Sequence, residues 1–174
     1  MYHSFTIMKI NYRQPDIKDG LDIYRLVQSC PPLDLNSAYC YLLLATHFAD
    51  TCVIAEDTTA GKIAGFVSAY FRPDAPRTLF VWQIAVHPDY RGQGIARGLT
   101  TALVEAAYRQ TTPPEYLELS VNPSNQASRG LFTRLAEQLG AELTESVLFS
   151  EELLGGGHEA EIMLRIGPLK GDPQ

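Results

Sequence analysis

Apolar and polar positions alternate in several short stretches of the chain, which predicts a sheet whose strands are separated by helices. Residues 5–12 alternate and indicate a first strand. The segments TCVIAED and KIAGFVSAYF, joined by the short turn TTAG, predict a hairpin. The segment TLFVWQIAVHP is almost continuously apolar, as expected for a central strand buried on both faces. Further strands are predicted at EYLELSV, ELTESVLF and EAEIMLRI.

Two helices are predicted between the first strand and the hairpin. The first is opened by Pro15 and Asp16 and ended by the prolines at 31 and 32. The second runs from Ser37 to about residue 48, with Asn36 or Ser37 as its cap. The apolar face of the first helix is expected to consist of Ile17, Leu21, Tyr24 and Val27.

Two more helices are expected over residues 92–109 and 124–139. The resulting order β-α-α-β-β-β-α-β-α-β-β is typical of one mixed α/β domain. No repeat and no low-complexity linker interrupts it, so residues 1–174 are predicted to form a single domain.

Composition narrows the class of protein. Hydrophobic residues make up 45% of the chain and charged residues 20%, which is ordinary for a soluble globular protein. The net charge of −6 makes nucleic acid a poor partner and favours cationic ligands, although it also serves solubility. No segment is apolar enough to span a membrane and the start of the chain has no leader pattern, so we predict a cytoplasmic protein.

The three cysteines, at 30, 40 and 52, are odd in number and lack metal-type spacing. They are expected to be buried thiols, with no disulfide framework and no metal site.

The segment from residue 84 to 103, IAVHPDYRGQGIARGLTTAL, carries the most specific chemistry. Small residues at 92, 94 and 96 let the backbone approach a ligand closely just where a helix begins. The free N–H groups and the dipole of a helix N-terminus favour an anion there, which suits a pyrophosphate. The segment lacks the Gly-Lys-Ser/Thr ending of a nucleotide-triphosphate loop and the three-glycine spacing of a dinucleotide fold.

Arg91-x-x-Gly94-x-Ala96, placed after the strand IAVHP, resembles the signature of the GCN5-related N-acetyltransferases. The later segment LELSVNPSNQASRGLF is similar to that family's fifth strand and the helix that follows it. The resemblance implies acetyl-CoA as co-substrate, no metal, and a mixed sheet of six or seven strands with splayed strands 4 and 5 and about four flanking helices. The cofactor contacts that it implies are Ile84 and Val86 for the pantetheine arm, Arg91, Gly92, Gln93, Gly94, Ile95 and Ala96 for the pyrophosphate, and Asn125, which is alternatively a helix cap.

One position departs from the family pattern. The tyrosine often proposed to protonate the departing thiolate aligns with Phe132, which has no proton to give. Another acid must serve, or the thiolate leaves unaided, since a thiol has a pKa of about 8.5.

A narrower resemblance concerns the acceptor. Four segments between residues 33 and 168 are similar to the diaminobutyrate acetyltransferases: LDLNSAYCYLLLATHFADTCVIAED, LFVWQIAVHPDYRGQG, VNPSNQASRGLF and GGGHEAEIMLRIGP. This implies transfer of acetyl to the 4-amino group of L-2,4-diaminobutyrate, a step towards the compatible solute ectoine under osmotic stress. By analogy with many relatives, it also implies a homodimer.

The first acceptor-site candidates lie around the second predicted helix. We expect Asp34, in the loop before it, to bind an ammonium group of the substrate; the alternative is a solvated loop acid or a cap. Tyr39 and Tyr41 point about 200° apart, so at most one of them faces the site easily. We choose Tyr39 as substrate contact or as the acid that replaces the missing tyrosine, with packing as its alternative.

Three further candidates lie on the predicted fourth and fifth strands. Trp82 shares a strand face with Ile84 and Val86 and is expected to wall the site and stack over an ammonium group, unless it serves core packing. The charge of Glu118 is costly to bury on a central strand unless it is paired. Because side chains alternate along a strand, Asn122 is expected on the same face. Both are expected to bind the substrate, although Asn122 also suits a turn at the strand end.

His158 follows three glycines at 155–157, a stretch expected to be mobile and to close over bound substrate. A histidine, with an ordinary pKa of about 6.5, can accept the ammonium proton. His158 is therefore the first candidate for general base and a substrate contact, Glu159 is the second, and a plain surface loop is the alternative. The substrate carboxylate needs a donor, for which Arg72, Arg77 and backbone amides remain equal candidates.

Two rival functions remain open at this stage. One is the same chemistry on another amine, such as a polyamine, an aminoglycoside or a protein N-terminus. The other is a non-catalytic module that binds acetyl-CoA, which Phe132 favours.

Overall fold

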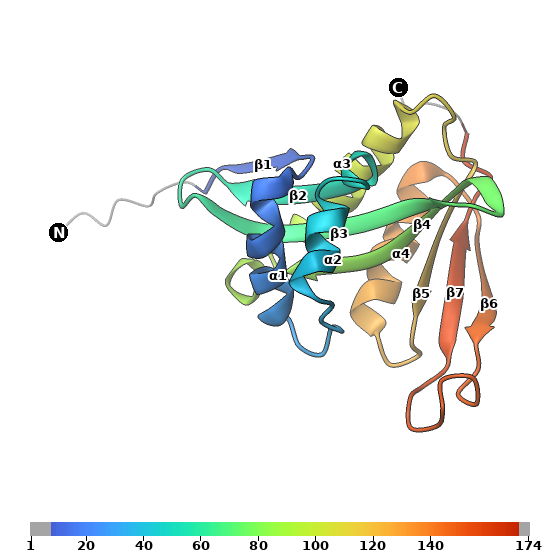
Figure 1. The fold of residues 1–174 in the computed structure, drawn as a ribbon. Coiled ribbons are helices and arrows are strands. Elements are labelled where there is room, and N and C mark those ends of the chain that lie inside the picture. The colour runs from blue at the N-terminus through green and yellow to red at the C-terminus, as the bar shows by residue number, and fades with distance from the viewer. Residues whose placement is uncertain (1–7, 171–174) are drawn as a thin grey trace. The chain divides into compact units, whose positions relative to one another are not determined.

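The computed structural model describes residues 8–170, whose strands form one mixed sheet in the order β1-β2-β3-β4-β5-β7-β6 (Figure 1). The strands are β1 (Ile10–Arg13), β2 (Cys52–Asp57), β3 (Lys62–Arg72), β4 (Ala75–Val86), β5 (Tyr116–Val121), β6 (Leu143–Phe149) and β7 (Glu161–Ile166). The α-helices are α1 (Gly20–Gln28), α2 (Ala38–Leu44), α3 (Ile95–Tyr108) and α4 (Gln126–Leu139). Short 3-10 helices are η1 (Ile17–Asp19), η2 (Ala49–Thr51) and η3 (Pro88–Tyr90).

The predicted order of strands and helices is confirmed, with shifts at the ends of elements. The first strand lies at Ile10–Arg13, and residues 5–7 of its predicted span lie outside the described residues. Helix α2 is shorter than predicted and ends at Leu44. Ser37 caps it by accepting a hydrogen bond from the Cys40 N–H, as one of the two predicted caps.

The chain folds into two compact units, which we describe separately. The first consists of Met1–Ser68 and Gln83–Leu103, and the second of Ala69–Trp82 and Val104–Gln174. Strands β3 and β4 and helix α3 each contribute residues to both units.

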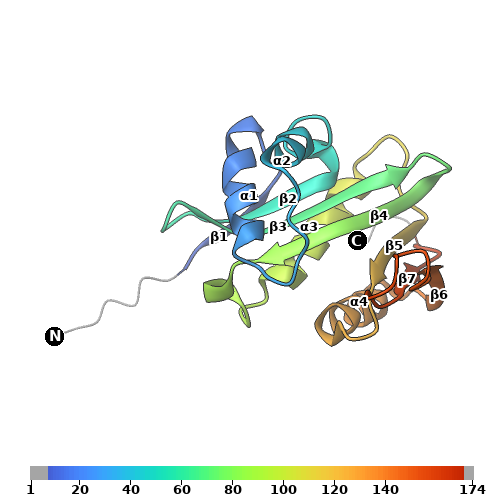
Figure 2. The ribbon, with the colours of Figure 1, turned by 60° about the horizontal axis from the view of Figure 1, so that its bottom comes forward.

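In the first unit, α1 and α2 lie side by side on one face of the strands (Figure 2). The predicted apolar face is confirmed at Val27, which is buried, and at Tyr24, which packs against the core, but it is wrong at Ile17 and Leu21, which are exposed. The buried residues of α1 include Ile23, Leu26 and Val27, which continue the i, i+3, i+4 stripe towards Cys30. They belong to one core cluster with Tyr41, Cys52, Ile54, Phe66 and Ala85.

Helix α3 begins against the first unit's strands at two glycines. A Cβ on Gly65 of β3 would meet Ile95 Cγ2 and Leu99 Cδ1, each at 2.9 Å. A Cβ on Gly98 would collide with the ring of Tyr12 on β1. The small residues therefore let the first turns of α3 lie directly on the sheet, which places the N-terminus of the helix at the end of β4.

The second unit contains the ladder between β4 and β5. These strands are parallel, and their pairs run from Thr78 with Tyr116 to Val81 with Leu119. The pairing ends there, although β4 continues to Val86 and β5 to Val121. β7 pairs antiparallel with both β5 and β6. Helix α4 lies alongside β5 in both views (Figures 1 and 2).

Candidate active site

The predicted phosphate loop is an exposed turn between η3 and α3. Gly92 and Gly94 have φ values of 75° and 79°, a left-handed conformation that glycine adopts without strain. The first helical hydrogen bond runs from the Gly98 N–H to the Gly94 carbonyl at 3.0 Å, so the N–H groups of Ile95 and Ala96 precede it. The loop and the helix start together have the geometry that favours an anion.

Side chains of the loop support its own backbone. Arg91 Nε donates to the Val86 carbonyl at 3.3 Å, and Gln93 Nε2 donates to the Asp89 carbonyl at 3.1 Å. A Cβ added at Gly92 or Gly94 would meet no atom within 4 Å, so the space over the turn is open. The geometry fits the pyrophosphate of coenzyme A.

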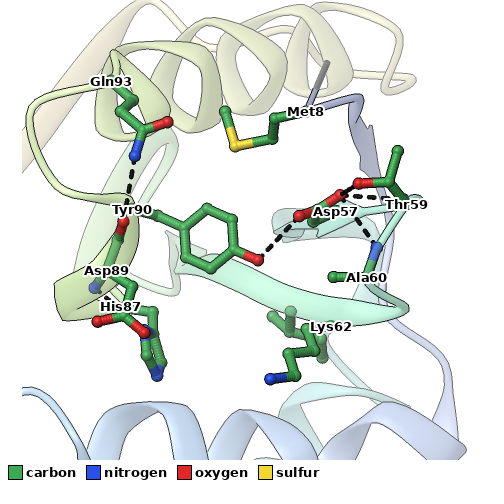
Figure 3. A pocket seen from close by; sticks show the side chains of 10 residues that line it. Met8, Asp57, Thr59, Ala60, Lys62, His87, Asp89, Tyr90 and Gln93 are labelled. Atoms are coloured by element: carbon green, nitrogen blue, oxygen red, sulfur yellow. Dashed lines mark hydrogen bonds and ion pairs between the residues drawn. The ribbon is translucent and has the colours of Figure 1, made fainter. Parts of the chain in front are cut away.

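A hydrogen bond connects the start of the loop to the β2–β3 turn, beside a cavity of about 460 Å³ (Figure 3). The Tyr90 hydroxyl donates to Asp57 Oδ2 at 2.9 Å. Asp57 Oδ1 accepts from Thr59 Oγ1 at 2.5 Å and from the N–H groups of Thr59 and Ala60 at 2.9 and 3.3 Å. The hydrogen bonds from Thr59 and Tyr90 lower the pKa of Asp57, while burial and Asp57 raise the pKa of Tyr90.

The predicted pantetheine contacts lie at the end of β4, beside the loop. The His87 N–H donates to the Ala64 carbonyl of β3 at 2.9 Å, so the polar groups of Ile84 and Val86 face the opposite edge, because successive residues of a strand alternate. The Val86 carbonyl at that edge accepts from Cys30 Sγ and Arg91 Nε, each at 3.3 Å. This carbonyl, one of the predicted pantetheine contacts, therefore already has two protein donors.

The first unit also holds the candidates around α2. Tyr39 is 69% exposed and Tyr41 is 0% exposed, so the two tyrosines do lie on different sides of the helix. The carboxylate of Asp34 is exposed and has no hydrogen bond or ion pair to residues 8–170. Its backbone carbonyl accepts from Gln83 Nε2 at 2.8 Å, which holds the loop of Asp34 on β4.

In the second unit, the end of β5 and the β6–β7 connection meet through side chains. Ser124 Oγ contacts Asn122 Oδ1 at 3.3 Å and donates to Glu159 Oε2 at 2.5 Å. His158, next to Glu159, is exposed, and its imidazole makes no hydrogen bond within the described part of the chain. The structure thus brings Asn122 together with Glu159, and Ser124 is the link that the sequence did not reveal.

Glu118 lies in the second unit as a fully buried carboxylate, with 0% exposure. Arg72 Nη1 donates to one of its oxygens at 2.7 Å, and Arg165 Nη1 to the other at 2.6 Å. Arg72 also binds Asp74, at 2.6 Å. These pairs meet the cost of the buried charge, so Glu118 is paired as a carboxylate on a central strand has to be.

The remaining candidate side chains differ in their exposure and in the residues that they contact. Trp82 is 48% exposed, which argues against a purely packing role. Asn125 caps α4 through a hydrogen bond from the Ser128 N–H to its Oδ1 at 3.1 Å, which is the alternative role that the sequence allowed. Phe132 is buried in α4. Arg77, a candidate for the substrate carboxylate, pairs with Glu115 at 3.3 Å.

Sequence reasoning missed Gln83 and Arg165, although each left a signal. Gln83 is the one strongly polar side chain in the apolar run LFVWQIAV, and Arg165 is the basic residue of the last strand. A polar side chain on a largely apolar strand favours a hydrogen-bond partner, so each position could have been paired with a neighbour in advance. Among residues 8–170, no group of three or more metal-ligating side chains is present, and no helix is long and apolar enough to cross a membrane.

The chain matches the model of the Acetyltransferase (GNAT) family over residues 21–136. Two curated relatives are L-2,4-diaminobutyric acid acetyltransferases. The protein of Halomonas elongata is 48% identical over 92% of this chain and 82% of its own length. The protein of Bordetella parapertussis is 45% identical over 97% of this chain and 89% of its own length.

A solved structure is similar over nearly the whole chain. It is the diaminobutyrate acetyltransferase EctA from Paenibacillus lautus in complex with its substrate L-2,4-diaminobutyric acid and coenzyme A. The TM-score is 0.85 and the identity 41%, over 96% of this chain and 99% of the other.

Proposed function

We propose that this chain, which belongs to the acetyltransferase (GNAT) family, transfers acetyl from acetyl-CoA to the 4-amino group of L-2,4-diaminobutyrate. The products are N4-acetyl-L-2,4-diaminobutyrate and CoA. The observation that carries the proposal is the likeness to the Paenibacillus lautus enzyme, whose structure holds this substrate together with coenzyme A.

The first unit has the features needed to hold acetyl-CoA, which supplies an activated thioester. The turn of Gly92 and Gly94 and the start of α3 are suited to the pyrophosphate. The polar backbone groups of Ile84 and Val86 face away from β3. We assign those of Ile84 and the N–H of Val86, whose carbonyl already has two protein donors, to the pantetheine arm. Asn125 is assigned to the cofactor as well, through the amide nitrogen that its capping bond does not use.

The acceptor must be anchored and also lose a proton. An alkylamine has a pKa of about 10, so roughly a thousandth of it is neutral at pH 7, and only the neutral form attacks a thioester. Asp34, whose carboxylate has no partner among residues 8–170, is proposed to hold one ammonium group, and Trp82 and Asn122 are each proposed as further substrate contacts. His158 is proposed as the base for the other amine, with Glu159 as the second choice. Tyr39 is proposed to protonate the thiolate, in place of the family's tyrosine, whose position Phe132 occupies here.

The cysteines support direct attack without an acetyl-enzyme. Cys30 and Cys52 are buried, and burial raises the pKa of the Cys40 thiol. A nucleophilic cysteine needs a lowered pKa in an electropositive setting, which is the opposite arrangement.

The cellular setting belongs to the same proposal. We infer a cytoplasmic homodimer that acts in ectoine synthesis under osmotic stress. The support is the resemblance to the diaminobutyrate acetyltransferases described from the sequence. Size-exclusion chromatography with light scattering tests the dimer, and a mass of about one chain would contradict it.

The test of the activity is release of CoA thiol from acetyl-CoA by purified protein. Diaminobutyrate, spermidine, lysine and ornithine are offered in parallel, and the product is examined by NMR for the position of the acetyl group. We expect fast release with diaminobutyrate and acetylation at the 4-amino group. Faster release with another amine would replace the substrate, and tight acetyl-CoA binding without release would favour the non-catalytic module.

A further inference from the structure

A chain of hydrogen bonds connects the core of the first unit to the loop that bears Asp34. The Tyr41 hydroxyl donates to Gln83 Oε1 at 3.1 Å, and Gln83 Nε2 donates to the Asp34 carbonyl at 2.8 Å. The Asn36 N–H donates to the Tyr41 oxygen at 3.4 Å. The loop before α2 is therefore fastened to β4 and α2 at two positions, 34 and 36.

The direction of every bond in this chain is fixed by chemistry. The Asp34 carbonyl can only accept, so the amide nitrogen of Gln83 must face it and the amide oxygen must face Tyr41. A tyrosine hydroxyl has one proton, and it goes to that oxygen because the Asn36 N–H occupies the acceptor side. The side-chain amide of Gln83 thus cannot flip without breaking both of its hydrogen bonds.

Tyr41, at the inner end of this hydrogen-bond network, is held in place by packing. Tyr41 is among the largest fully buried side chains, and its ring packs edge-on against Tyr24 and Phe66, with centroids 6.2 and 6.3 Å apart. By contrast, the Asp34 carboxylate at the other end is exposed and unpaired among residues 8–170. The network fixes the backbone of Asp34 while leaving its charged group free to bind a ligand.

We propose that Tyr41 and Gln83 are positioning residues for the acceptor amine: they set the Asp34 loop, and so the affinity for the ammonium group of the acceptor. The inference rests on the proposed function and deepens it. Neither residue acts on the acetyl group, so their loss should raise KM for diaminobutyrate and leave KM for acetyl-CoA unchanged.

The first test removes single atoms from the network. Tyr41→Phe keeps the packed ring and deletes the hydroxyl, so we expect KM for diaminobutyrate to rise roughly threefold to tenfold, the range of one net hydrogen bond. Tyr24→Phe is the matched control, because it makes the same change on the neighbouring ring, outside the network, and should leave both KM values unchanged. Thermal unfolding of each variant is measured alongside.

The second test uses Gln83→Glu and pH. An ionised carboxylate at this position still accepts from Tyr41 but cannot donate to the Asp34 carbonyl, whereas a protonated one can. The ratio of KM for diaminobutyrate, variant over wild type, should therefore be high at pH 8 and fall as the pH approaches about 4.3, the ordinary pKa of a glutamate, where half of the carboxyl is protonated. Tyr41 and Asp34, the titratable residues bonded to Gln83 among those described, are present in both proteins, so the ratio reports position 83.

A purely structural role predicts something else. In that case Tyr41→Phe and Gln83→Glu would lower kcat and raise both KM values in step with a lower melting temperature, and the ratio would not change with pH. That outcome, or unchanged KM for diaminobutyrate in folded variants, overturns the inference. Wild-type protein that releases no CoA with diaminobutyrate overturns the proposed function instead, so the two failures are distinguishable.

Discussion

Glu118 and Asp34 are two carboxylates that we predicted from the sequence as substrate contacts, and their surroundings differ. Glu118 is buried and neutralised by Arg72 and Arg165. Arg165 also stacks on the Tyr116 ring, with its guanidinium carbon 3.8 Å from the centroid. Breaking such a buried pair costs about 3–5 kcal/mol, so this carboxylate serves the fold. Asp34 is exposed and unpaired among the described residues, and remains available to a cation.

The role of His158 is tested through the protonation state of the substrate. His158→Ala should lower kcat by about a hundredfold at pH 7, the scale of a lost general base. At pH 10, where roughly half of an alkylamine is already neutral, the loss should be much smaller. Rates of thiol release across this pH range provide the measurement.

His47→Ala is the control, since His47 is an exposed histidine on the first unit. It should change the rate at neither pH. Equal losses for His158→Ala at both pH values would point to binding or folding and remove His158 as the base.

At the scale of elements, the phosphate loop depends on backbone conformation as well as charge. Gly94→Asp introduces a side chain at a φ of 79° and a negative charge beside the proposed pyrophosphate site. We expect affinity for CoA, measured by calorimetry, to fall by at least about a hundredfold, because like charges repel at a site of this kind.

Gly140→Asp separates the two effects. Gly140, at the C-terminus of α4, has a φ of 59° and equally open surroundings, so the substitution imposes similar strain away from the loop. CoA affinity should survive in that variant. Equal losses in both variants would attribute the effect to folding, and unchanged affinity in Gly94→Asp would remove the loop as the cofactor site.

The sequence predicted the elements well because periodicity and turn residues are local signals. The hairpin of β2 and β3, the central strand β4 and the order of all elements were confirmed. The buried face of α1 was confirmed only in part, since two overlapping apolar stripes compete and only packing selects the one with Ile23 and Val27. The pairing of Glu118 with Arg165 also escaped prediction, because their register across β5 and β7 joins residues 47 apart in the chain.

At the scale of the whole molecule, hydrogen-bonded carboxylates make the free energy of unfolding depend on pH. Hydrogen bonds from Thr59 and Tyr90 lower the pKa of Asp57, and Arg72 lowers that of Asp74. Because the folded pKa lies below the unfolded value of about 3.9, each contributes stability that is present above that value. This contribution is lost as the pH falls through the folded pKa.

Asp57→Asn removes one of these titrations. We expect its free energy of unfolding, from urea denaturation, to be lower than that of wild type at pH 7, with the difference shrinking below about pH 4 as the wild-type carboxyl protonates. A difference that stays constant from pH 7 to pH 2.5 would show that Asp57 contributes only packing.

The three glycines before His158 have a left-handed backbone conformation, which limits the residues that can replace them. Gly155, Gly156 and Gly157 have φ values of 84°, 72° and 91°, and a Cβ at each would meet nothing within 4 Å. Space therefore does not exclude a side chain there; only the chirality of L-amino acids does. A mirror-image residue prefers this backbone region, so D-alanine introduced by chemical ligation should be accepted where L-alanine is strained. The loop requires glycine for its left-handed course, whether or not it moves during catalysis.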